Sequence, residues 1–132
     1  MKVLVIDDDP SMTELLALLL RPITLEVVTA NTAPDGILMA KDQSPDVIVL
    51  DLMMPDMDGY QVCSAIRAFS SVPILILSAL DMPGMVSKAL DAGADDYLIK
   101  PVTSGILIAH LNNLVRRASA PVEKSHSVQN PQ

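Results

Sequence analysis

The chain has 132 residues, half of them hydrophobic and 19% charged, a composition typical of one globular domain rather than of a disordered protein. Its formal charge of −7 argues against direct nucleic-acid binding by this domain, because such binding rests on neutralising phosphates. A single cysteine excludes an internal disulfide, and no apolar run is long enough for a membrane span or a signal peptide, so we expect a cytoplasmic protein that is not bound to a membrane.

The first predicted element is an apolar strand at residues 3–6, which runs directly into three consecutive aspartates. A helix follows, with Asp9 as its N-cap and Pro10 at its first position, where a missing N–H costs nothing. A second strand is expected at residues 25–28. A second helix is expected over residues 33–43, which ends before a Ser-Pro-Asp sequence.

The middle of the chain repeats this alternation. A strand at residues 46–50, apolar from residue 47 onward, ends at Asp51, and a continuously apolar one at residues 73–77 ends at Ser78. Between them lies a predicted helix with Val62, Ile66 and Phe69 at helical spacing. Its cysteine, at position 63, is expected to be a buried thiol without a reactive role.

The last third holds two helices around a strand. The first helix has Val86 and Leu90 four residues apart and ends on Gly93, a natural C-cap. A strand at residues 96–99 precedes Lys100. The final helix places one apolar face toward the core, formed by Leu107, Leu111, Leu114 and Val115.

The apolar pattern stops at Ala118, so we expect one domain over residues 1–117. Residues 118–132 are polar, and are expected to form a flexible tail or the start of an interdomain linker. Five strands alternating with five helices predict a doubly wound α/β sandwich with a parallel sheet. Continuously apolar strands favour this fold, because both of their faces are covered by helices.

Ligands of such a sheet bind beyond the carboxyl ends of its strands. Polar residues follow four of the predicted strands, and parallel strands would bring them to one edge. Three carboxylates clustered there would cost on the order of 10 kcal/mol if they stayed ionised and unpaired. Raised pKa values, a divalent cation or Lys100 could each offset this cost. Neither histidine, at positions 110 and 126, fits this edge, so a metal there would be a hard ion such as Mg²⁺.

Four segments together resemble the receiver (CheY-like) domain of bacterial two-component response regulators. They are VLVIDDDP, PDVIVLDLMMPDMDG, PILILSA and ALDAGADDYLIKP, in the family's order and at suitable spacing over residues 1–117. The resemblance implies a flavodoxin-like (βα)5 sandwich whose five parallel strands lie in the order 2-1-3-4-5.

The resemblance also implies roles for individual residues. Asp51 matches the phosphoacceptor, and Asp7 and Asp8 match the acidic pair that holds Mg²⁺ together with Asp51 and the backbone carbonyl of Met53. Lys100 matches the lysine that pairs with phosphoryl oxygens. The remaining matches are the hydroxyl that senses the phosphoryl group, the aromatic that turns inward, the proline of a cis bond and a loop glycine: Ser78, Tyr97, Pro101 and Gly59.

A phosphorylation-dependent signalling switch is the function that this resemblance implies. The phosphoryl donor would be a sensor histidine kinase or a phosphotransfer protein, and phosphorylation would change the surface of the fourth helix, fifth strand and fifth helix. The output would pass to an effector domain or protein, or to a homodimer. Beyond taking up a phosphoryl group and slowly losing it, the domain would not be an enzyme. We expect the loss to be slow because Met53 and Leu80 are apolar and cannot orient a water.

The chain departs from the family at the surface where many transcriptional members form charged pairs between subunits. Ile106 replaces an acidic residue, His110 an arginine and Val86 a basic residue. A dimer through this surface is therefore expected to be less sensitive to salt. Val102 also replaces a frequent phenylalanine beside Lys100.

Two other functions are disfavoured by the sequence. Residues 56–59, DMDG, resemble the Asp-x-Asp signature of haloacid-dehalogenase-like phosphatases, which also use an aspartyl phosphate. That signature follows its strand directly, whereas LMMP intervenes here. A receiver that serves only as a docking module is disfavoured because all the matched site residues are present.

Overall fold

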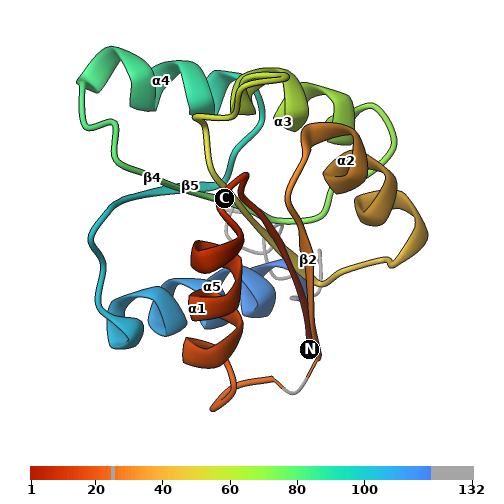
Figure 1. The fold of residues 1–132 in the computed structure, drawn as a ribbon, viewed down its shortest axis with the longest axis vertical. Coiled ribbons are helices and arrows are strands. Elements are labelled where there is room, and N and C mark those ends of the chain that lie inside the picture. The colour runs from red at the N-terminus through yellow and green to blue at the C-terminus, as the bar shows by residue number, and fades with distance from the viewer. Residues whose placement is uncertain (25, 120–132) are drawn as a thin grey trace, which may run out of the picture.

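Five parallel strands alternate with five helices in the computed structural model, which describes residues 1–24 and 26–119 (Figure 1). The strands lie in the order β2-β1-β3-β4-β5, so the predicted fold class and strand order are confirmed. The elements in chain order are β1 (Lys2–Ile6), α1 (Pro10–Leu19), β2 (Glu26–Ala30), α2 (Ala33–Asp42), β3 (Val47–Leu50), α3 (Gly59–Arg67), β4 (Ile74–Ser78), α4 (Pro83–Asp91), β5 (Asp96–Ile99) and α5 (Ser104–Ser119).

Helices α2, α3 and α4 cover one face of the sheet, and α1 and α5 cover the other (Figure 1). Alternate residues of the central strands point to opposite faces, so Leu4 and Ile6 enter one hydrophobic core while Val3 and Val5 enter the second. Strands β1, β3 and β4 are buried on both faces in this way. Their unbroken apolar sequences follow from this two-sided burial.

The element ends differ from the predicted ones in two places that matter below. Ser78 is the last residue of β4 rather than the first residue after it. Helix α5 continues through Ser119, so Ala118 and Ser119 are helical and not part of a tail. The rest of the predicted tail, and His126 within it, lies outside the described residues. In the described part of the chain, no helix has the length and apolarity needed to cross a membrane.

Two apolar residues that the sequence places at helical spacing are exposed. Helix α3 ends at Arg67, so Phe69 lies beyond the helix and is 40% exposed, with the Lys41 ammonium 5.7 Å from the centre of its ring. On α4 the buried residue is Ala89, which turns Leu90 outward. Cys63 is buried as predicted, and burial raises the pKa of its thiol, which disfavours the reactive thiolate.

Side-chain contacts fix several helix ends. The Asp9 carboxylate accepts a hydrogen bond from the Ser11 N–H (2.9 Å), which confirms it as the N-cap of α1. The Arg67 guanidinium, at the end of α3, pairs with Asp95 (2.8 Å) and donates to the Gly93 carbonyl (3.0 Å). Arg67 also donates to two carbonyls of the α3–β4 loop, so one side chain joins α3 to the starts of β4 and β5.

Candidate functional site

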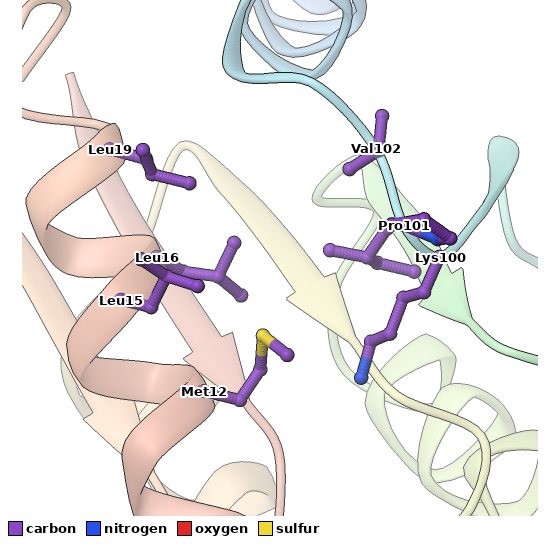
Figure 2. A pocket seen from close by; sticks show the side chains of 8 residues that line it. Met12, Leu15, Leu16, Leu19, Lys100, Pro101 and Val102 are labelled. Atoms are coloured by element: carbon purple, nitrogen blue, oxygen red, sulfur yellow. The ribbon is translucent and has the colours of Figure 1, made fainter.

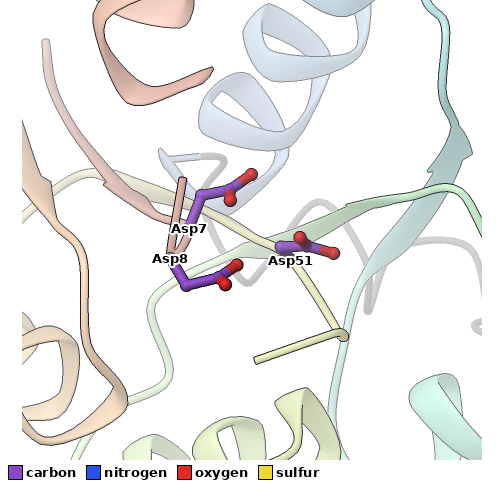
Figure 3. Close-up of side chains that lie close together, drawn as sticks. All are labelled: Asp7, Asp8 and Asp51. Carbon is purple, nitrogen blue, oxygen red and sulfur yellow. The ribbon is translucent and has the colours of Figure 1, made fainter. Parts of the chain in front are cut away.

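The carboxyl ends of β1 and β3 bring three aspartates together. These strands are neighbours in parallel register, and Ile6 pairs with Leu50, so the residues that follow each strand emerge side by side. Figure 3 shows the carboxylates of Asp7, Asp8 and Asp51 directed to the same side of the chain. One oxygen from each lies within 4.8 Å of the others.

Lys100 reaches this cluster from the end of β5. Its Nζ lies 3.1 Å from Asp7 Oδ2 and 3.6 Å from Asp51 Oδ2. Both carboxylates are buried, with Asp7 3% and Asp51 8% exposed. The ammonium therefore offsets charge where solvent offers little screening, which is one of the three ways that the strand-end pattern left open.

Backbone donors hold the two buried carboxylates as well. The Asp9 N–H donates to Asp7 Oδ1 (3.0 Å), and the Met53 N–H donates to Asp51 Oδ1 (3.2 Å). Burial raises the pKa of Asp51, and the charge of Asp7 adds to the rise, while the Met53 N–H and Lys100 oppose it. Each of these two carboxylates thus has a fixed orientation and at least one further lone pair on each oxygen.

Asp8 differs from its neighbours, because it is exposed and has no hydrogen bond or ion pair with another described residue. Its oxygens are free to bind a cation. Mg²⁺ takes oxygen ligands at 2.0–2.1 Å in octahedral geometry, which places neighbouring ligands about 3 Å apart and opposite ones about 4 Å apart. A small movement of the Asp8 side chain, or a bridging water, would bring this all-oxygen donor set into that range. The residues present therefore fit a hard divalent cation.

Ser78 and Tyr97 connect this edge of the sheet to β5. The fully buried Ser78 hydroxyl accepts a hydrogen bond from the Leu80 N–H (3.3 Å), and the Tyr97 hydroxyl donates to the Leu80 carbonyl (2.6 Å). Burial raises the pKa of Tyr97, and the nearby Ser78 side chain opposes the rise. The Tyr97 ring packs against the core, so Leu80 links both side chains of this predicted pair.

Backbone constraints shape the two loops beside the cluster. The Lys100-Pro101 bond is cis, as the resemblance implies. A Cβ at Gly59 would lie 2.6 Å from the Leu52 Cα and 2.9 Å from the Asp51 carbonyl oxygen. Only glycine allows α3 to start this close to the backbone that carries Asp51.

The two aspartates of the phosphatase-like sequence have other partners. Asp56 Oδ2 accepts a hydrogen bond from the Ala33 N–H at the start of α2 (3.2 Å), and Asp58 forms a capping box with Gln61 at the start of α3. Neither belongs to the acidic cluster. The geometry of these two aspartates therefore does not favour a phosphatase function.

A groove next to the cluster was not predicted from the sequence. It has a volume of about 330 Å³ and lies between α1 and the loop after β5. Figure 2 shows Met12, Leu15, Leu16 and Leu19 of α1 facing Pro101 and Val102 across it. Lys100 lines the same groove, so the apolar surface adjoins the buried carboxylates.

Asn31 is a second feature that sequence reasoning missed. Its Nδ2 donates to the Asp7 carbonyl oxygen (2.8 Å) and to the Thr13 hydroxyl (3.2 Å). An asparagine after a strand normally indicates a turn. The signal that could have singled it out is its place at the end of β2, the strand beside β1.

Comparisons with known proteins agree with this geometry. A sequence model of the response regulator receiver domain matches residues 3–112. The probable transcriptional regulator ycf27 of Guillardia theta is 39% identical over 95% of this chain and 49% of its own length. The transcriptional regulatory protein KdpE of Mycobacterium tuberculosis is 39% identical over 96% of this chain and 56% of its own length.

The crystal structure of a two-component response regulator from Clostridium difficile superposes with a TM-score of 0.86. The two chains are 29% identical, and the match covers 91% of this chain and 99% of that one. The chain spans about half the length of the curated relatives named above.

The fold and the acidic edge define a doubly wound α/β domain with a carboxylate cluster suited to a divalent cation. More specifically, the chain belongs to the response regulator receiver domain family, and its resemblance to two-component regulators is thereby confirmed.

Proposed function

We propose that this domain is a phosphorylation-dependent switch that accepts a phosphoryl group on Asp51 in the presence of Mg²⁺. The observation that carries the proposal is the cluster of Asp7, Asp8 and Asp51, with Lys100 bridging its two buried members. Asp7, Asp8, Asp51 and the Met53 carbonyl would hold the cation. It would supply charge neutralisation between the attacking carboxylate and the phosphoryl oxygens.

In this proposal an oxygen of Asp51 attacks phosphorus, and the bond from phosphorus to the donor nitrogen breaks. The nitrogen keeps the electron pair and takes up a proton. The Met53 N–H holds Asp51 Oδ1 at 3.2 Å, so the carboxylate is oriented before the donor arrives. Lys100 already lies 3.6 Å from Asp51 Oδ2 and can turn its ammonium to a phosphoryl oxygen.

The groove beside α1 is the proposed docking surface for the phosphoryl donor, a histidine kinase or a phosphotransfer protein. It is apolar and adjoins Lys100, so a helix seated in it would lie next to Asp51. Leu15, which lines the groove, is 47% exposed, and Leu18 extends the apolar surface of α1 with 55% exposure. Large exposed leucines on one helix face favour a protein partner.

Phosphorylation would change the α4–β5–α5 surface through Ser78 and Tyr97. A phosphoryl group carries strong acceptor oxygens, and a Ser78 hydroxyl turned toward them would release its contact with the Leu80 N–H. Leu80 also accepts the hydrogen bond of Tyr97, so its movement would shift that ring on β5. This is a local charge change acting on a packed element with two arrangements.

Two of the positions that depart from the family place apolar side chains on the proposed output surface. Ile106 is 50% exposed and Val86 is half-buried, while His110 Nδ1 lies 2.5 Å from Asp96 Oδ2 within the same chain. We propose that any homodimer formed here rests on apolar contacts. Sedimentation of the phosphorylated protein at low and high salt tests this, and dissociation by salt would contradict it.

The relatives named as transcriptional regulators are about twice as long as this chain. We propose that residues 1–117 act as the receiver, with 118 and 119 completing α5. The effector would be a further domain or a separate protein. The reading frame beyond Gln132 distinguishes these two arrangements.

Mass spectrometry after treatment with acetyl phosphate and Mg²⁺ tests the proposed site. Wild type should gain one phosphoryl group, and Asp51→Asn should gain none. Asp56→Asn is a matched control, because Asp56 is an exposed aspartate of the same loop that accepts a hydrogen bond from the Ala33 N–H instead of joining the cluster. Equal modification of wild type and Asp51→Asn would refute the assignment.

A further inference from the structure

The Asp7–Asp8 peptide is the part of the acidic cluster whose position matters most for Asp8. No described side chain holds the Asp8 carboxylate. Its location therefore depends on its own backbone, and that backbone leaves β1 at Asp7. Whatever fixes the carbonyl between Asp7 and Asp8 also fixes the direction in which Asp8 leaves the sheet.

Asn31 makes that contact. Its Nδ2 lies 2.8 Å from the Asp7 carbonyl oxygen and 3.2 Å from Thr13 Oγ1. The Thr13 hydroxyl donates to the Pro10 carbonyl (3.0 Å), so it accepts from Asn31. Both partners are acceptors, and both amide hydrogens of Asn31 are used.

The two contacts tie three elements together. Asn31 follows β2, Asp7 follows β1, and Thr13 is a buried residue in the first turns of α1. The Asp7 N–H also donates to the Ala30 carbonyl (3.1 Å), which continues the β1–β2 ladder one step past the strands. The β1–α1 loop, which carries Asp8, is thus held at the Asp7 end by the strand ladder and Asn31, and at the α1 end by Thr13.

We propose that Asn31 is a positioning residue for cation binding, acting through the Asp7–Asp8 peptide. This inference rests on the proposed Mg²⁺ site. Asn31 is neutral, so it sets geometry without changing the charge of the cluster. Outer contacts that orient metal ligands are typically worth 10–100-fold in metal affinity, which gives the scale of the expected effect.

Isothermal titration of the full chain with MgCl2 tests this. Asn31→Ala should raise the Kd for Mg²⁺ about 10-fold. Thr32→Ala is the matched control, because Thr32 is the adjacent residue and caps α2 by accepting from the Asp35 N–H (3.2 Å), without touching Asp7. Its Kd should stay within about twofold of wild type. Thermal midpoints in EDTA should show similar losses for the two variants.

Thr13→Val provides a second test that spares the Asp7 contact, for the case in which Asn31→Ala does not fold. It removes the 3.2 Å partner of Asn31, together with the hydrogen bond from Thr13 to the Pro10 carbonyl, and should raise the Kd by a smaller factor. The inference would be overturned if the folded variant, Asn31→Ala or Thr13→Val, bound Mg²⁺ with the wild-type Kd while Asp8→Ala lost binding. The proposed Mg²⁺ site would then still be supported. Equal weakening in Asn31→Ala and Thr32→Ala would overturn the inference as well. If wild type bound no Mg²⁺, the proposed function would fail with it.

Discussion

Replacing Asp8 with asparagine tests whether the acidic cluster holds repulsion that a cation relieves. Its carboxylate oxygen lies within 4.8 Å of an oxygen of Asp7 and of Asp51. At that separation two unit charges repel by about 3 kcal/mol at an effective dielectric of 20, and by about 1 kcal/mol in water. Asp8 is exposed, so the value in water is the better guide, and two such repulsions amount to about 2 kcal/mol.

Lys100 attracts Asp8 and offsets part of this repulsion. We expect Asp8→Asn to be more stable than wild type by about 1 kcal/mol in EDTA at low ionic strength, because the change removes a net repulsion. For a domain of this size that corresponds to a thermal midpoint about 4 °C higher. Scanning calorimetry measures the shift directly.

Magnesium should reverse this order. At a free concentration ten times the wild-type Kd, binding stabilises the wild type by about 1.4 kcal/mol. Asp8→Asn lacks a ligand and should gain much less, so the wild type becomes the more stable protein. Glu14→Gln is the control, because it removes one exposed charge from α1, outside the cluster. The order of its thermal midpoint and that of the wild type should be the same in EDTA and in Mg²⁺.

Two results would refute this reasoning. A wild type that melts above Asp8→Asn already in EDTA would mean that the cluster holds no net repulsion. A variant that stays above the wild type in Mg²⁺ would mean that Asp8 is not a cation ligand.

Three further predictions concern Asp51, the two apolar residues expected to flank a phosphoryl group, and Arg67 at the opposite edge of the sheet. Burial raises the pKa of Asp51, so its contribution to folding is fully present below pH 3.8 and is lost as pH rises through the folded pKa. Asp51→Asn should therefore melt above metal-free wild type at neutral pH, and a gap that does not close in acid would contradict this. Met53→Asn and Leu80→Gln should shorten the phosphoryl lifetime several-fold in timed mass spectrometry, because a polar side chain there can orient water. Unchanged lifetimes in both would refute the idea. Arg67→Met should lower the free energy of urea unfolding by about 2 kcal/mol, because Asp95 and three carbonyls lose a donor. A loss near zero would show that water replaces this donor.

The central sheet could be predicted from the sequence because burial on both faces leaves an unambiguous pattern. Residues 3–6 of β1 are all apolar and fully buried, since the strand's neighbours in the sheet and the helices on each side exclude water. Strand β5 lies at the edge, and its Ile99 is 43% exposed. Its short run, DYLI, also predicts a strand, but the pattern is weaker because the edge position leaves none of its four residues fully buried.

Helical spacing was a weaker guide to which residues are buried. Helical spacing places residues on one face only within the helix itself, and α3 ends two residues before Phe69. It also leaves the rotation of a helix open. Helix α4 turns the small Ala89 inward, so Leu90 next to it is exposed.

The charged part of the site could be predicted because each residue directly follows a strand. Asp7, Asp51 and Lys100 needed only the assumption of a parallel sheet to be placed at one edge. Asn31 also follows a strand directly, but the predicted second strand ended at residue 28, so the pattern did not reach it. Arg67 lies at the end of a helix and could not be found in this way. Their roles depend on which strands are neighbours and on how side chains cross between elements, and no spacing along the chain encodes either fact.

The charges of the cluster explain why a phosphoryl group would move its surroundings. Three carboxylates and one ammonium leave a net charge of −2, which one divalent cation neutralises. Phosphorylation of Asp51 replaces one carboxylate charge with about −1.5 to −2, so negative charge remains beside Lys100 even with the cation bound. The Ser78 hydroxyl oxygen accepts a hydrogen bond from the Leu80 N–H, and this contact does not use the hydroxyl proton. The Ser78 O–H can therefore donate to the excess negative charge. Turning it would release the N–H of Leu80, the residue whose carbonyl accepts the hydrogen bond of Tyr97.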